Sequence, residues 1–166
     1  MLDRANLSPI VPPPVSLTAE EQQKINKDFV HAAEGLGTLS DLETLLNKGA
    51  EVDAHGDFGS TALHAACLRG NTGMVELLVS HGATVNASDE SQATPLHFLI
   101  EGTDFDKKTT DLARYLLDNG ADWQAKNDEG RIPIDLAHEQ GDADLIALLD
   151  GEEGIRHGSI PMLQRT

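Results

Sequence analysis

The chain has 166 residues, of which 39% are hydrophobic and 24% are charged, a composition typical of a soluble protein, and no apolar run approaches the ~18 residues of a membrane helix. Its formal net charge is -16, and the whole surplus lies in residues 28–151, where 23 acidic side chains outnumber seven basic ones. Such a surface should repel nucleic acid and anionic lipid and attract basic proteins, although the acidity could also serve solubility alone.

The N-terminal segment, residues 1–17, is expected to be an irregular arm. Pro9 and the run Pro12-Pro13-Pro14 exclude a helix interior and favour polyproline II. The arm could be a ligand for an aromatic-lined groove, or it could lie along its own domain with Ile10 and Val11 as anchors. It has no basic start followed by an apolar core, so we expect no secretory signal.

The first helix is expected to begin near Thr18, because Thr18 and Glu21 fit a capping box in which each side chain accepts a hydrogen bond from a free backbone N–H. An apolar stripe at helical spacing should then face the core: Ile25, Phe29, Ala32 and Ala33. A second helix over about residues 39–47 should end before Gly49. It carries four leucines on one face: Leu39, Leu42, Leu45 and Leu46.

The next stretch, residues 61–93, recurs along the chain. Shifted by 33 positions, Thr61-Ala62-Leu63-His64 meets Thr94-Pro95-Leu96-His97, and residues 82–87 meet residues 49–54 in the same way. The sequence therefore resembles the ankyrin repeat, which has a period of 33 and opens with T-P-L-H-x-A. The resemblance covers about residues 28–151. It implies an all-α solenoid of helix-turn-helix units joined by short hairpin-like turns.

Four repeats fit into a domain of residues 18–151, and their boundaries lie at about 28–60, 61–93, 94–131 and 132–151. The outer repeats depart from the motif, as terminal units with one face in water do. Four leucines should face the core: Leu63, Leu78, Leu96 and Leu116. The third repeat holds five extra residues around Phe105, which could form a contact or be a neutral insertion. Residues 152–166 form a tail in which Ile160, Met162 and Leu163 could pack against the last helix or a partner.

Three histidines recur every 33 residues, His31, His64 and His97. A shared zinc ion is excluded, because stacked helices lie about 8–10 Å apart while each ligand must come within ~2.1 Å of the ion. The resemblance implies instead that each histidine ties its helix start to a neighbouring loop. The single cysteine, Cys67, should be a small buried side chain. With no secretory signal, it favours a reducing compartment, the cytoplasm, with the nucleus left open.

No catalytic motif occurs in the sequence, and Asp104, Asp106 and Asp111 miss the spacing of a calcium-binding loop. We therefore expect no enzymatic activity, no metal and no cofactor.

The resemblance implies that hairpin tips and exposed positions of each first helix line a concave surface that binds proteins. In this chain the tip positions are Asp57, Phe58, Ser60, Glu90, Ser91, Ala93, Asp128, Glu129 and Arg131, and the helix positions are Leu68, Arg69, Glu101, Glu139 and Gln140. Phe58 and Leu68 are the large apolar members, and an apolar anchor surrounded by charge is typical of a binding hot spot. These residues could also be solvated turn residues. Trp123 is a second possible anchor, although its place at a hairpin base suggests that it is packed.

The predicted function is therefore a non-catalytic protein-binding module, monomeric on its own. It would bind a basic protein through its acidic concave surface and act as an adaptor, an inhibitor or a dedicated chaperone. The alternative is a structural subunit of a larger assembly, fastened by the arms 1–17 and 152–166. We expect neither nucleic acid nor membrane as a partner.

Overall fold

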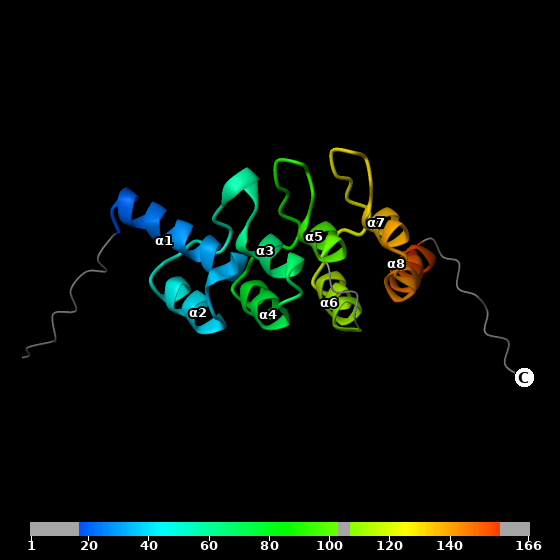
Figure 1. The fold of residues 1–166 in the computed structure, drawn as a ribbon, viewed down its shortest axis with the longest axis horizontal. Helices are drawn as coiled ribbons and strands as arrows, with labels where there is room; N and C mark the ends of the chain where they lie inside the picture. The colour runs from blue at the N-terminus through cyan, green and yellow to red at the C-terminus, as the bar shows by residue number, and fades with distance from the viewer. Residues whose placement is uncertain (1–16, 103–106, 157–166) are drawn as a thin grey trace, which may run out of the picture.

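Helices in two rows build the computed structural model, which describes residues 17–102 and 107–156 (Figure 1). The first row consists of α1 (Ala19–His31), α3 (Ala62–Leu68), α5 (Pro95–Glu101) and α7 (Pro133–Gln140). The second row consists of α2 (Leu39–Asn47), α4 (Thr72–Ser80), α6 (Lys107–Asp118) and α8 (Ala143–Arg156). Hairpin-like loops project from the first row. In the described part of the chain, the only strand-like pairing is an isolated bridge between His55 and Thr61, so the all-α prediction is confirmed.

Three predicted features lie outside the described residues. These are the proline-rich part of the N-terminal arm with Ile10 and Val11, the inserted residues around Phe105, and the end of the tail with Ile160, Met162 and Leu163.

Each first helix except α1 begins at the repeat motif, and the sequence explains why. Thr94 takes the extended N-cap conformation, Pro95 follows at the first helical position, and the His97 ring accepts the Thr94 N–H at 3.1 Å. In the last repeat, Asp135 takes the place of the histidine and accepts the Ile132 N–H at 3.0 Å. The predicted capping box of Thr18 and Glu21 opens α1 as expected.

The core runs continuously between the two rows. Helix α3 packs against α4 and α5, and α5 packs against α6 and α7. The four leucines expected to face the core are at most 1% exposed, which confirms the stacking: Leu63, Leu78, Leu96 and Leu116. Trp123 is 2% exposed, so it is a packing residue and not a surface anchor.

The four leucines of α2 are buried to different extents. Leu39, at the first position of the helix, is 41% exposed. Leu42 is fully buried, whereas Leu45 and Leu46 are half-buried.

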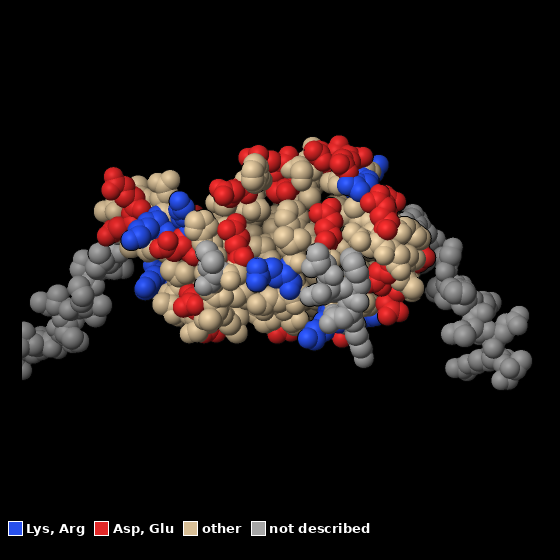
Figure 2. Space-filling view, in the orientation of Figure 1, with Lys and Arg blue, Asp and Glu red and all other residues tan. Residues whose placement is uncertain are grey.

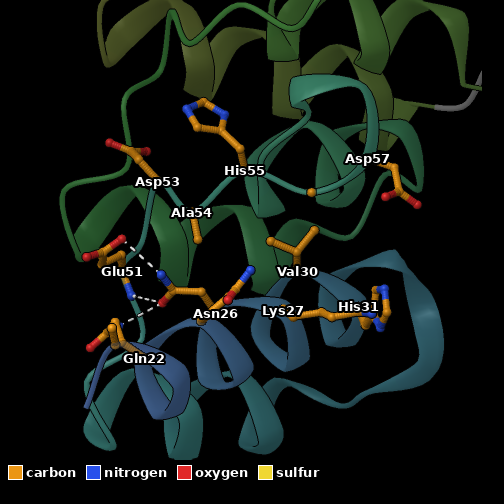
Figure 3. Close-up of a pocket in the computed structure, with 13 residues that line it drawn as sticks. Gln22, Asn26, Lys27, Val30, His31, Glu51, Asp53, Ala54, His55 and Asp57 are labelled. Carbon is orange, nitrogen blue, oxygen red and sulfur yellow. Dashed lines mark hydrogen bonds between the residues drawn. The ribbon is translucent and has the colours of Figure 1, made fainter. Parts of the chain in front are cut away.

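The first turns of α1 cap the stack by imitating part of a hairpin loop. Between the second and third loops, the Asn86 amide accepts from the Asp122 N–H (2.7 Å) and donates to the Gly120 carbonyl (2.9 Å). At the first loop, two α1 side chains make the corresponding two hydrogen bonds, one each. Asn26 accepts from the Glu51 N–H (3.0 Å) (Figure 3). Gln22 donates to the Gly49 carbonyl (2.9 Å). An added helical turn thus satisfies backbone groups that a preceding repeat would otherwise bind.

Helix α8 extends further than expected. It ends at Arg156, whereas the sequence suggested an end at Gly151. A glycine ends a helix when it adopts a left-handed conformation, and Gly151 is not among the residues with positive φ. Gly141, which does end α7, has a φ of 75°. The domain boundaries proposed from the sequence stay predictions.

Candidate functional site

The hairpin tips are ordered by their own side chains. In the second loop, the Asp89 carboxylate accepts hydrogen bonds from the backbone N–H groups of Ser91 and Ala93, both at 2.9 Å. Asn127 organises the third loop in the same manner. Asp and Asn favour turns because their short side chains can bond to the backbone a few residues on. These two tips are therefore fixed in shape.

Adjacent tips are also joined to one another. The Glu90 N–H donates to the Phe58 carbonyl of the first loop (2.9 Å), and the Asp128 N–H donates to the Ser91 carbonyl of the second (2.8 Å). The two donors, Glu90 and Asp128, hold equivalent places in their repeats, and so do the two acceptors, Phe58 and Ser91. The three tips, residues 57–60, 89–93 and 127–131, therefore form one row, which we call the tip row.

The first tip differs from the other two and presents an aromatic side chain. Gly56 replaces the Asp89 and Asn127 of the later loops, and a Cβ at this position would lie 2.5 Å from Cγ1 of the buried Val30. The turn follows another path, in which Phe58 takes a φ of 56° that non-glycine residues rarely adopt. Its side chain is 78% exposed. A strained backbone that holds a large apolar group in water is typical of a functional position.

A hollow of about 490 Å³ lies beside the tip row. Six of the predicted site residues line it: Asp57, Phe58, Ser60, Glu90, Ser91 and Asp128. Figure 2 shows that acidic side chains gather along the edge of the molecule formed by the hairpin loops. Two further lining residues, Asp89 and Phe98, were not singled out from the sequence.

Phe98 gives the hollow an aromatic wall. It belongs to α5, is half-buried, and meets the His64 ring in a T-shaped contact with centroids 4.9 Å apart. The equivalent residue is Ala65 in the second repeat and Leu136 in the last. An aromatic at a position that elsewhere holds smaller side chains was the available signal in the sequence.

These repeats agree with a family comparison. The family model for ankyrin repeats, in three copies, matches residues 29–127. The chain belongs to the ankyrin-repeat family. No curated protein matches the sequence. Ankyrin repeats generally mediate protein–protein interaction.

Two of the three motif histidines make the inter-repeat ties of the ankyrin repeat. His64 Nδ1 accepts the Thr61 N–H (3.0 Å), and Nε2 donates to the Ala93 carbonyl (3.1 Å). His97 makes the same pair of bonds to Thr94 and Arg131. A backbone N–H only donates and a carbonyl only accepts, so both rings are neutral with the proton on Nε2. Burial lowers the pKa of each histidine, against the opposing effect of the carbonyl bonds.

The extension of this role to His31 is wrong. His31 is half-buried at the C-terminal end of α1, and its ring makes no hydrogen bond with the described residues. Helix α1 begins at Ala19, twelve residues before His31, so no helix begins near His31 for its ring to cap.

The remaining predicted site residues do not line the hollow, and one of them, Arg131, is engaged in ion pairs. Arg131 forms ion pairs with Glu129 and, at 2.7 Å, with Glu139. These are the two ion pairs between described residues. Glu101, on α5, has a raised pKa. Burial is the largest cause, Arg131 opposes it, and nearby acids, including Glu129 and Glu139, add to it. The carboxylates of Glu101, Glu129 and Glu139 therefore lie near one another and share Arg131 as their cation.

Leu68 and Arg69 lie at the C-terminal end of α3, as its last residue and its C-cap. Arg69 donates from its guanidinium to the Glu34 carbonyl (3.0 Å), which ties α3 to the first repeat. Leu68 is 44% exposed, as expected. Gln140, the last of the mapped helix positions, is exposed at the end of α7.

A second hollow, of about 610 Å³, lies between α1 and the first loop (Figure 3). Its lining carries Lys27 on α1 and three carboxylates on the loop, Glu51, Asp53 and Asp57. Of the predicted site residues it includes only Asp57. The Glu51 carboxylate already accepts from the Asn26 amide, and the Asp53 carboxylate already accepts from Thr84.

Cys67 is buried, and burial raises the pKa of its thiol far above its ordinary range. The Cys67 thiol is therefore not ionised near neutral pH and does not act as a nucleophile. Across residues 17–102 and 107–156, no helix has the length and apolar character needed to span a bilayer.

Proposed function

We propose that the chain is a non-catalytic binding module that holds a basic protein against its tip row. The observation that carries this proposal is the combination of three joined tips, each bearing carboxylates, with one aromatic side chain exposed among them. Joined tips lose little conformational freedom when they bind, so more of the contact energy is available for affinity. Among the possible roles, adaptor, inhibitor and dedicated chaperone all use such a face.

The proposed binding has two stages. The net charge of -16 first attracts the partner and raises the association rate, an effect that weakens as salt is added. Phe58 and the apolar part of the hollow then dock against the partner. Desolvated aromatic groups near the centre of an interface contribute more to affinity than charged groups at its rim.

We test the proposal by charge reversal in a pull-down, followed by binding kinetics on the captured protein. Glu90→Lys/Asp128→Lys changes two tip carboxylates that make no hydrogen bond or ion pair with the described residues. The association rate should fall about tenfold or more in this variant, and by a similar factor between about 50 and 500 mM salt. Phe58→Ala should instead raise the dissociation rate.

The matched control is Glu76→Lys/Asp118→Lys, which changes net charge equally on α4 and α6, outside both hollows. It should retain most of the association rate. Equal losses in the two double variants, or an association rate that ignores salt, would contradict the tip row as the binding face. Loss of binding only after deletion of residues 1–17 and 152–166 would favour the structural-subunit alternative.

A further inference from the structure

Three carboxylates of the smaller hollow form no ion pair with any described residue. Asp57, Glu90 and Asp128 come from three different tips and line the same space. The described residues supply none of these three carboxylates with a hydrogen bond or an ion pair. The Asp89 carboxylate, in contrast, is already used within its own turn.

The hollow's apolar surface is aromatic and held in place. The Phe98 ring rests edge-to-face on His64, and His64 is itself fixed by bonds to Thr61 and Ala93. Phe58 stands at the rim on a tip joined to the next by the Glu90 N–H. Two phenylalanines therefore border the space that the three carboxylates surround.

From this arrangement we infer that the hollow takes a single arginine side chain of the basic partner. The aliphatic stem would lie on Phe98, and the guanidinium would lie between the tip carboxylates beside Phe58. Arginine suits the space better than lysine. Its planar group stacks on aromatic rings, and it has five donors for carboxylates that approach from different sides. The lysine ammonium is more strongly hydrated and offers no plane to stack.

The inference rests on the proposed function, since it names the group by which the partner is recognised. The chain's own Arg131 does not compete for the hollow, because its guanidinium is already paired. Glu129 and Glu139 hold that guanidinium at the far end of the third loop. The tip carboxylates are thereby left for a cation from outside.

The test uses three uncharged-flank peptides as NMR probes: acetyl-Gly-Arg-Gly-amide, its lysine counterpart and its citrulline counterpart. Citrulline keeps the shape of arginine without the charge. The arginine peptide should shift the Phe98 ring signals and the amides of Glu90 and Asp128 in a saturable manner. Binding of the lysine peptide should be at least about threefold weaker, and the citrulline peptide should cause no saturable shift.

Two variants complete the test. Phe98→Leu, which keeps an apolar side chain against His64, and Asp128→Asn should each weaken the arginine peptide about threefold or more. Glu76→Gln, on α4, should leave its affinity unchanged. Equal binding of citrulline and arginine, shifts spread over α4 and α6, or an unaltered affinity in Phe98→Leu would overturn the inference.

The two proposals fail separately. If the arginine peptide does not bind the hollow while Glu90→Lys/Asp128→Lys still slows partner association, the arginine seat is wrong and the binding face stands. If the peptide binds as expected while the double reversal leaves partner association unchanged, the seat stands and the tip row is not where the protein partner is held.

Discussion

Replacing His64 with alanine should lower the free energy of unfolding by about 3–5 kcal/mol. The His64 ring is fully buried, accepts the Thr61 N–H and donates to the Ala93 carbonyl. Alanine would leave the Thr61 N–H without its acceptor, while the Ala93 carbonyl would keep only its bond from the Asp89 N–H. It would also open a cavity beside Phe98. Urea unfolding followed by fluorescence of the single tryptophan, the buried Trp123, measures the change.

His31→Ala is the matched control for this substitution. It removes the same ring from the equivalent place in the repeat, where the ring makes no hydrogen bond with the described residues, and it should cost less than about 1 kcal/mol. Similar losses for the two variants would show that ring volume, and not the inter-repeat tie, accounts for the effect.

The same tie gives stability a pH dependence. Burial lowers the pKa of His64 and of His97 below the unfolded value near 6.5, so the unfolded chain takes up protons first as the pH falls. The free energy of unfolding should therefore decrease as the pH drops below about 6.5 and level off below the folded-state pKa values. Protonation of Nδ1 would also remove the acceptor for the helix-start N–H. The decrease should be smaller in His64→Ala, because of the two histidines with lowered pKa only His97 remains.

The second large effect is expected at Leu78. This side chain, on α4, is fully buried between the two rows, and Leu78→Ala should lower the free energy of unfolding by about 3–5 kcal/mol. The loss combines the transfer free energy of the three deleted carbons with the cost of the cavity that remains, because close-packed surroundings relax only in part.

Leu39→Ala provides the comparison, since it makes the same chemical change at a side chain that is 41% exposed. We expect a cost of about 1 kcal/mol or less, measured by the same urea unfolding. If Leu39→Ala were as costly as Leu78→Ala, the arrangement of the first repeat would have to differ from the one described.

Much of the fold follows from the period of the sequence. Leu63 and Leu96 hold the same place in two repeats, and both are buried. In these two internal repeats, Thr61 and Thr94 mark where the first helix begins. The ends are harder to predict, because a terminal helix lacks one of the neighbouring repeats against which the equivalent internal residues pack. His31 is placed by repetition, and it differs from His64 and His97 for this reason. The pairing of Gln22 and Asn26 with the first loop has no repeat signature at all.

The candidate site was predictable to the extent that it lies on turns fixed by the repeat. Six tip residues were placed by register alone and line one hollow. Phe98 was missed because helix positions were assigned only at the ends of the first helices, whereas its ring reaches the hollow from the middle of α5. The ion pairs of Arg131 depend on rotamers and on α7, which no spacing rule determines.

The most direct measurement of the central claim is hydrogen–deuterium exchange of the chain, free and bound to the captured basic protein. If the tip row grips the partner, protection on binding should concentrate in residues 56–60, 89–93 and 127–131, and the amides of α2 and α4 should exchange as before. Protection confined to α2 and α4, with the three tips unchanged, would contradict the account.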